Sequence, residues 1–195
     1  VYSRQSKGLP IINLIQIDKD EKVNSIISVS RDSEYKYLVF ATKNGIVKKT
    51  ELVEYENIRQ SGKIAIGLRD DDELIDVRLS TGEDKIILGS TSGRMVVFDE
   101  NEIRPMGRTA SGVKGINLDG ALCTGMEIGN DESNILVVTE NGYGKKTFVT
   151  EYRETKRGSK GVRALNITEK NGNMVAHKIV TDDKDLLIIT AEGMI

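Results

Sequence analysis

The stretch TKNGIVKKTELVEY at residues 42–55 decides the fold, because it returns in altered form as TENGYGKKTFVTEY at residues 139–152. Two similar stretches of fourteen residues in a chain of 195 indicate a duplicated structural unit. Each stretch has an Asn-Gly pair between two runs of strand-forming residues, which predicts a type I′ turn with positive φ at both central residues. Both stretches are therefore predicted to be β-hairpins.

Shorter copies extend the repeat along the chain. In each copy an apolar run leads through a short polar turn to a glycine, and these glycines are Gly45, Gly93, Gly142 and Gly193. They are 48, 49 and 51 residues apart. A second motif, a glycine followed by a short apolar run, lies between the hairpins at residues 8–14, 62–68, 112–118 and 161–167. With the segments that follow, these motifs give about four strands per period and no long segment of helical periodicity.

A period of about 49 residues with about four antiparallel strands is typical of propeller blades. The sequence therefore predicts a single all-β domain over residues 1–195. Its repeats run approximately over residues 1–36, 37–84, 85–133, 134–185 and, in part, 186–195. Because neither end coincides with a whole repeat, we expect part of a longer array. A β-sandwich or a stacked β-solenoid is the alternative.

Composition excludes several classes of protein. The apolar runs are far shorter than the roughly 20 residues of a membrane-spanning helix, and the polar, basic start is unlike a signal peptide. Cys123 is the single cysteine, so the chain has no intramolecular disulfide and fits a reducing, cytoplasmic compartment. His177 is the single histidine, which excludes a multi-histidine metal or catalytic site. We expect no membrane partner.

Positive charge gathers in loops directly before the glycine-led motifs, although the net charge is −2. These basic loops cover residues 4–8, 59–63, 104–114 and 153–163. Acidic residues gather elsewhere in the period, at residues 18–21, 70–73, 131–132 and 182–185. If each repeat is one blade, the basic loops line one rim and the acidic loops another, and an acidic protein can then bind a polyanion along its basic edge. Solvated loop charges without a ligand are the alternative.

Two lysine pairs follow the hairpin glycines and are weaker candidates for a polyanion surface: Lys48, Lys49, Lys145 and Lys146. Adjacent strand residues face opposite sides, so at most one lysine of each pair joins a given surface. Such lysines could equally protect a sheet edge from pairing. The middle repeat has Val96 and Val97 at these positions.

Motifs for catalysis or metal binding are missing. Residues 89–93 lack the lysine of a phosphate-binding loop, and no Ser-His-Asp arrangement has motif support. The acidic residues 70–73 do not match a calcium loop. Tyr55 and Tyr152 share one repeat position with Ile103, and an isoleucine there predicts packing rather than chemistry. We expect no catalytic residue and no metal site.

Three segments, at residues 41–50, 141–147 and 161–172, resemble the C-terminal domain of bacterial DNA gyrase A, part of a type IIA topoisomerase. The segment KGLPIINL at residues 7–14 fits the same domain. The resemblance implies a β-pinwheel of six propeller-like blades, with a strand exchanged between neighbours, of which this chain holds about four. The family's box of the form QRGGKG is absent, and KRGSKG at residues 156–161 is a degenerate relative.

The resemblance also implies a function. Duplex DNA, bound without sequence preference, would wrap around the basic outer rim so that the parent enzyme can introduce negative supercoils. The implied DNA contacts are Arg4, Lys7, Arg59, Lys63, Arg104, Arg108, Lys114, Arg153, Lys156, Arg157, Lys160 and Arg163. This domain would need no cofactor, since ATP and Mg²⁺ are used elsewhere in the parent enzyme.

The implied partners are double-stranded DNA, the rest of gyrase A, and gyrase B in a heterotetramer, in the bacterial cytoplasm at the nucleoid. The alternatives are the corresponding C-terminal domain of topoisomerase IV and a propeller-type platform for protein interactions.

Overall fold

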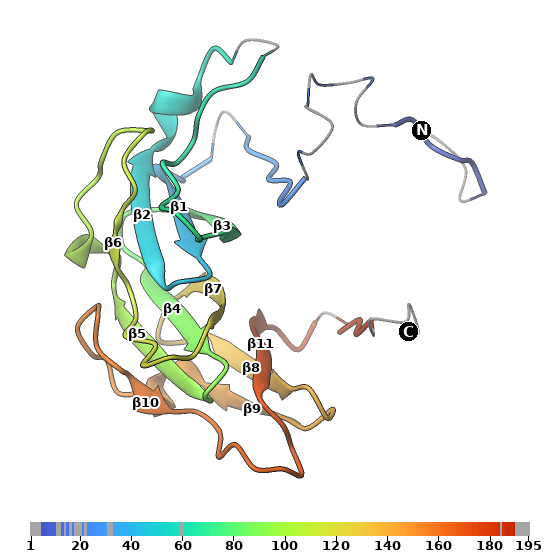
Figure 1. Ribbon diagram of the computed structural model, residues 1–195, viewed down its shortest axis with the longest axis vertical. Helices are drawn as coiled ribbons and strands as arrows, with labels where there is room; N and C mark the ends of the chain where they lie inside the picture. Colours follow the sequence, from blue (N-terminus) through green and yellow to red (C-terminus); the bar gives the residue numbers. More distant parts are fainter. Residues whose placement is uncertain are drawn as a thin grey trace.

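The computed structural model describes residues 5–10, 13, 15, 17, 21, 23–30, 33–58, 61–183 and 185–189. Within this part of the chain, eleven strands form three consecutive antiparallel sheets that follow one another along an arc (Figure 1). The other regular elements there are three short 3₁₀-helices, η2 (Leu52–Tyr55), η3 (Glu100–Glu102) and η4 (Val149–Glu151). No helix among the described residues is long and apolar enough to cross a membrane.

Each sheet is a propeller-like blade made of a hairpin and a third strand that pairs with the first strand of that hairpin. The hairpins are β1 (Tyr37–Thr42) with β2 (Ile46–Glu51), β4 (Lys85–Ser90) with β5 (Arg94–Asp99), and β8 (Asn134–Thr139) with β9 (Gly144–Phe148). The third strands are β3 (Leu74–Ser80), β7 (Cys123–Gly129) and β11 (Met174–Val180). The predicted all-β, blade-like architecture is confirmed.

The outermost strand of each of the first two blades comes from the following repeat. Strand β6 (Val113–Lys114) pairs with β2 of the first blade, and β10 (Val162–Arg163) pairs with β5 of the second. The strand orders are therefore β3-β1-β2-β6, β10-β5-β4-β7 and, for the described part of the third blade, β11-β8-β9. Strand exchange between neighbouring blades, the hallmark of a β-pinwheel, is thus present in this chain.

Glycine at the start of each exchanged strand makes this pairing possible. Gly112 and Gly161 have φ of +92° and +66°, a region that favours glycine. A Cβ at these positions would also collide with the carbonyl oxygen of Val47 or Met95, respectively, on the receiving hairpin. The glycine-led motif is therefore the sequence mark of a close backbone approach.

Replacing Gly161 by alanine should lower the free energy of unfolding more than replacing Gly142 by alanine. Both glycines have positive φ, which costs an alanine about 1–2 kcal/mol. The space next to Gly142 is open, whereas Gly161 also meets the Met95 carbonyl, so we expect at least about 1 kcal/mol of additional loss. Urea denaturation of both variants measures the difference, and equal losses would show that the close approach is relieved cheaply.

The hairpins are confirmed, but the predicted type I′ turn is wrong. The Gly45 N–H donates to the Thr42 carbonyl at 2.9 Å, and Gly45 has φ of +77°. Among the described residues, neither Asn44 nor Asn141 belongs to the few non-glycine residues with positive φ. The arrangement is a four-residue turn in which glycine takes the last position, where a left-handed residue is tolerated.

The glycine-led motifs differ from the predicted strands in length. The motifs at residues 112–118 and 161–167 form strands of two residues, and the motif at residues 62–68 forms none. The described residues of the motif at 8–14 are not in a strand either.

Apolar side chains fill the spaces between neighbouring blades. Ile86, Phe98 and Ile103, from the repeat at residues 85–133, pack with residues of the first blade in one core cluster. A second cluster joins the second and third blades and contains Tyr152, the repeat equivalent of Ile103. The prediction that the tyrosines at this position serve packing is confirmed for Tyr152.

A buried ion pair also joins the first two blades. Lys49 Nζ lies 3.3 Å from Glu100 Oε2, and these side chains are 1% and 0% exposed. The same oxygen accepts a hydrogen bond from Ser80, and the other carboxylate oxygen accepts from the N–H groups of Gly82 and Asp84. The carboxylate is therefore fully satisfied although it is removed from water, as a buried charge requires.

At the next junction two valines replace this ion pair. The backbone bonds are equivalent: the carbonyl of Lys49 accepts from Met106 as that of Val97 accepts from Thr155. Val149 occupies the place of Glu100, and both valines are buried in one cluster. Equivalent buried positions are therefore filled by an ion pair at the first junction and by two apolar side chains at the second.

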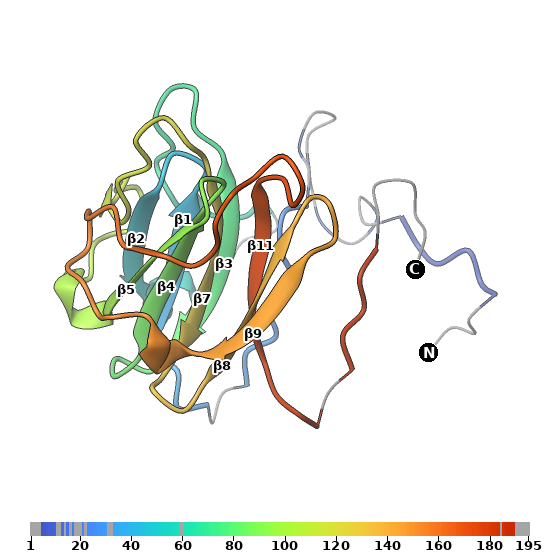
Figure 2. The same ribbon diagram turned by 90° about the horizontal axis from the view of Figure 1, so that it is seen from below.

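The third strands of the blades, β3, β7 and β11, lie side by side (Figure 2), on the concave side of the arc (Figure 1). Position for position, they carry Arg78, Glu127 and Lys178. Glu127 Oε1 forms ion pairs with Arg78 at 3.1 Å and with Lys178 at 3.2 Å. One ion-paired row therefore crosses all three blades.

His177 of β11 is buried next to this row, and its pKa is lowered below its ordinary value of 6.5, chiefly by burial. The unfolded chain then binds a proton more readily, so stability should be full above about pH 6.5 and fall as the pH drops. We expect a slope of at most about 1.4 kcal/mol per pH unit. His177→Gln should flatten it in urea denaturation between pH 7 and 5. An unchanged slope would assign the acid sensitivity to other groups.

Candidate nucleic-acid interface

The basic loops follow the hairpins in each repeat. The loops at residues 104–114 and 153–163 lie on the convex side of the arc, opposite β3, β7 and β11 (Figure 1). The loop at residues 61–69 follows the first hairpin and contacts the loop at residues 104–114 through a backbone hydrogen bond. The Gly67 N–H donates to the Ala110 carbonyl at 3.1 Å, as the Asn117 N–H donates to that of Ser159 at 2.8 Å. The three loops therefore form one continuous band, which we call the rim.

Two of the predicted DNA-contacting arginines also hold the rim together. Arg108 donates from its guanidinium to the Ile64 carbonyl at 3.0 Å. Arg157 makes the equivalent bond to the Lys114 carbonyl at 3.1 Å, one repeat later. Arg157 also donates to the Glu102 carbonyl. Both side chains are half-buried, so their structural bonds leave part of each guanidinium facing solvent.

Five predicted cations on the rim face solvent and have no acidic partner among the described residues: Arg104, Lys114, Arg153, Lys156 and Arg163. Lys114 and Arg163 are the second residues of the exchanged strands, and each bonds a nearby asparagine side chain, Asn117 at 3.3 Å and Asn166 at 3.0 Å. Strand exchange therefore places one exposed cation per junction on the outermost strand. These five side chains are free to bind an anion.

Acidic residues also enter the rim, so the predicted separation into a basic and an acidic band is incomplete. Lys160 forms an ion pair with Asp119 at 2.6 Å. The hydrogen bond from Lys160 lowers the pKa of the Asp119 carboxyl. Lys63 turns back onto its own repeat and donates to the Glu54 and Glu56 carbonyls. Lys160 and Lys63 are therefore less available to a ligand than the five free cations.

Lys48 and Lys49 are buried, and the prediction that they contact DNA is wrong. Their exposed fractions are 0% and 1%. Lys48 points toward the basic loops and Lys49 toward Glu100, so the two do face opposite sides of the sheet. The equivalent Lys145 and Lys146 are exposed, and Lys146 is ion-paired with Asp182 at 2.6 Å.

Arg4 and Arg59 lie outside the described residues. Lys7 is exposed in the segment 5–10, which lies apart from the rim (Figure 1).

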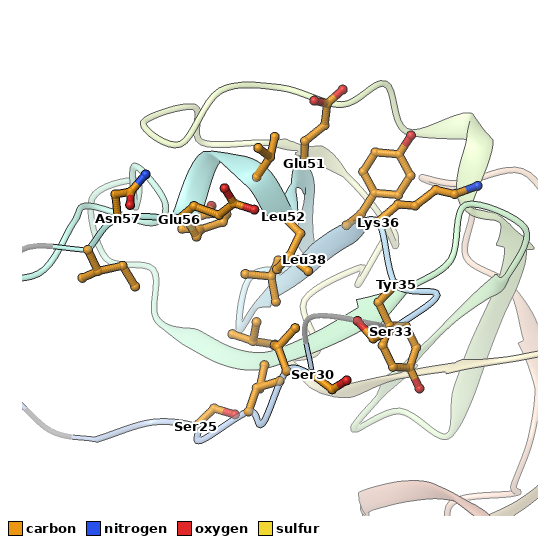
Figure 3. A pocket seen from close by; sticks show the side chains of 17 residues that line it. Ser25, Ser30, Ser33, Tyr35, Lys36, Leu38, Glu51, Leu52, Glu56 and Asn57 are labelled. Atoms are coloured by element: carbon orange, nitrogen blue, oxygen red, sulfur yellow. The ribbon is translucent and has the colours of Figure 1, made fainter.

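A cavity of about 1120 Å³ lies between residues 25–30 and 33–35 on one side and the first blade on the other (Figure 3). Serines and Tyr35 line it on one side, and Leu38 and Leu52 on the other. Ile86, the repeat equivalent of Leu38, is fully buried against the first blade. The cavity therefore lies over the face of the first blade that corresponds to the face with which the second blade packs against the first. It is separate from the rim. Among the described residues, no group of histidine, cysteine or acidic side chains could hold a metal ion.

Comparison with known families finds one match that covers most of the chain. The matching family is described as DNA gyrase C-terminal domain, beta-propeller, and the matched residues are 1–30, 36–81, 84–130 and 133–176.

Curated relatives agree with this match. The chain is 50% identical over 197 aligned positions to DNA gyrase A of Staphylococcus epidermidis and 47% identical to that of Staphylococcus aureus. Each alignment covers 99% of this chain and 22% of the relative, so the chain spans about a fifth of the length of these relatives.

Solved structures share the arrangement of blades. The C-terminal domain of DNA topoisomerase IV matches with a TM-score of 0.80 and 34% identity, over 90% of this chain and 55% of that one. The DNA gyrase A C-terminal domain matches with a TM-score of 0.77 and 26% identity, over 91% and 60%. The C-terminal domain of ParC from E. coli, at 15% identity and a TM-score of 0.61, shares the fold.

Proposed function

Because this chain belongs to the DNA gyrase C-terminal domain family, we propose that it binds duplex DNA along the rim and bends it. The observation that carries the proposal is the row of free cations on loops that hydrogen bonds join into one band. Their positions repeat with the blades, so a curved polyanion meets a cation at each junction. Short glycine-containing loops let the phosphate backbone approach closely.

The energetics favour many weak contacts. Duplex DNA is stiff, and bending 20–30 base pairs by 40–90° costs of the order of 1–6 kcal/mol. A row of phosphate contacts on a curved surface offsets this cost without reading any base. Binding should therefore depend strongly on salt and weakly on sequence.

In the parent protein we propose that this binding wraps DNA so that the topoisomerase can introduce negative supercoils. The remaining blades of a six-bladed array, the rest of gyrase A, and gyrase B would be the protein partners. This domain would supply no catalytic residue and no cofactor, with ATP and Mg²⁺ used elsewhere. We place the enzyme in the bacterial cytoplasm, at the nucleoid.

The topoisomerase IV counterpart is the second candidate, because a structure of that domain superposes well on this chain. The higher identity to the gyrase A relatives favours gyrase. A topology assay separates the two: intact parent protein that changes the linking number of a relaxed DNA circle in the presence of a relaxing topoisomerase wraps DNA, as expected for gyrase.

The affinity of this chain for a 40-base-pair duplex should fall steeply with salt. Five free cations on the rim predict a slope of log K against log salt of about −4 to −5, since each neutralised phosphate contributes about −0.9. Two duplexes of unrelated sequence should give equal affinities. Fluorescence anisotropy between 50 and 200 mM salt measures both quantities. A slope near zero, or no binding at low salt, would reject the proposed rim.

A further inference from the structure

Lys48 is a buried lysine whose hydrogen-bond partners are backbone carbonyls. Its Nζ donates to the Ala65 carbonyl at 2.5 Å and to the Arg108 carbonyl. The Phe40 ring covers it, with Nζ 5.1 Å from the ring centre. Ala65 belongs to the rim loop at residues 61–69 and Arg108 to the rim loop at residues 104–114, so one ammonium group joins two neighbouring loops of the rim.

The next junction makes the same connection without a lysine. Arg108 bonds the Ile64 carbonyl, and its equivalent Arg157 bonds the Lys114 carbonyl. The residues that follow, Ala65 and Gly115, are therefore also equivalent. The Gly115 carbonyl accepts directly from the Gly158 N–H at 2.6 Å, and Val96 takes the place of Lys48. The ammonium therefore replaces a direct backbone hydrogen bond between loops.

The charge of Lys48 has no acidic partner at this site. Burial and then the positive charge of Arg108 lower the pKa of Lys48 to about 8. Tyr55, the other titratable side chain at this site, donates its hydroxyl to the Ala65 carbonyl at 2.9 Å. The groups that stabilise its charge are two carbonyl oxygens and the Phe40 ring, so Lys48 acts here as a hydrogen-bond donor and not as a member of an ion pair.

We propose that Lys48 is a positioning residue for the DNA-binding rim: it fixes the loop at residues 61–69 against the loop at residues 104–114 and does not touch DNA. The proposal rests on the proposed function, because the loops it fixes carry the DNA contacts. Loops that are already fixed lose less conformational entropy when DNA binds, so the binding free energy is more favourable.

The test compares Lys48→Met with Lys145→Met, which removes the same charge at the equivalent but exposed position. Lys48→Met should speed hydrogen exchange of the Gly67 amide, the loop-to-loop donor, by about tenfold or more. It should weaken duplex binding by about two- to tenfold with the salt slope unchanged. Lys145→Met should leave the Gly67 exchange rate unchanged.

Other outcomes overturn the proposal. A salt slope shallower by about one would show that Lys48 contacts a phosphate itself. Unchanged exchange would show that Lys48 does not tie the loops, and faster exchange with unchanged affinity would show that the tie does not serve DNA binding. If Lys48→Met does not fold, Lys48→Gln, whose shorter side chain keeps an uncharged NH2 donor group, should give the same changes at smaller size. If wild-type protein binds no DNA, the proposed function fails, while the exchange data still decide the loop tie.

Discussion

Replacing Arg153, Lys156 and Arg163 together by glutamate should weaken duplex DNA binding by about three orders of magnitude at 0.1 M salt. Each neutralised phosphate contributes about eightfold at this salt concentration, so losing three contacts gives about 500-fold. Reversing the charges adds repulsion. The salt slope should become shallower by about 2.7, since three phosphates are no longer neutralised.

This variant tests the rim because its three side chains are exposed and bond no acidic residue in the described part of the chain. Arg157 and Lys160 are left unchanged, since Arg157 bonds the neighbouring loop and Lys160 pairs with Asp119. The control makes the same charge change outside the basic loops, at Lys36, Lys43 and Lys170, of which Lys43 pairs with Glu73 at 3.2 Å. An equal loss in the control would show that net charge, rather than the rim, governs binding.

Replacing Glu100 by valine should cost about 3–5 kcal/mol of unfolding free energy, the largest stability effect that we expect. Lys49 would then be a buried charge with no carboxylate beside it, held only by the backbone carbonyl of residue 100 and the Tyr37 ring. The N–H groups of Gly82 and Asp84 would also lose their acceptor. The second variant, Lys49→Val with Glu100→Val, copies the pair Val97 and Val149 of the next junction. It should lose less than Glu100→Val alone, because the buried charge is gone and only the two orphaned N–H groups remain, at about 1–3 kcal/mol for each.

Urea denaturation of both single variants and the double variant gives a double-mutant cycle. We expect a coupling free energy of about 2 kcal/mol or more between Lys49 and Glu100, because the two contact each other directly. Additive losses would mean that the ion pair itself contributes nothing and that Glu100 acts through its backbone bonds.

Periodicity was a strong predictor of the architecture. Hairpins at even spacing and glycine-led segments between them predicted blades, and the resemblance added strand exchange, which the structure shows. The turn type failed because an Asn-Gly pair fits either a turn with both central residues left-handed or one that ends on a left-handed glycine. The two turns differ by one residue in the pairing register of the flanking strands. That register is set by how these strands pair, which the turn sequence does not determine.

Burial of the lysine pair was missed although the sequence carried a signal. The middle repeat has Val96 and Val97 where the first has Lys48 and Lys49. An apolar residue at an equivalent position indicates packing, and the same reasoning correctly predicted that Tyr152 packs like Ile103. A strand pattern cannot show that loops from later in the chain will cover a lysine, because those contacts join residues up to 60 positions apart.

The structural role of Arg108 and Arg157 had no sequence signal. Arg108 and Arg157 bond backbone carbonyls of the preceding loop, and a carbonyl acceptor leaves no mark on residue type. The pairing of Lys160 with Asp119 was hidden for a related reason, since 41 residues separate the two. Loop sequences predicted where charge gathers, while the fold decides which charges stay free.

Strand exchange also orders the events of translation. The first hairpin ends at Glu51, yet the strand that closes its sheet begins at Val113, 62 residues later. At about 5–20 residues per second, a ribosome needs about 3–12 s to supply it. Until that strand is synthesised, the outer strand of a nascent blade has an unpaired edge. Each of the first two blades can therefore complete its sheet only after part of the following repeat has been translated.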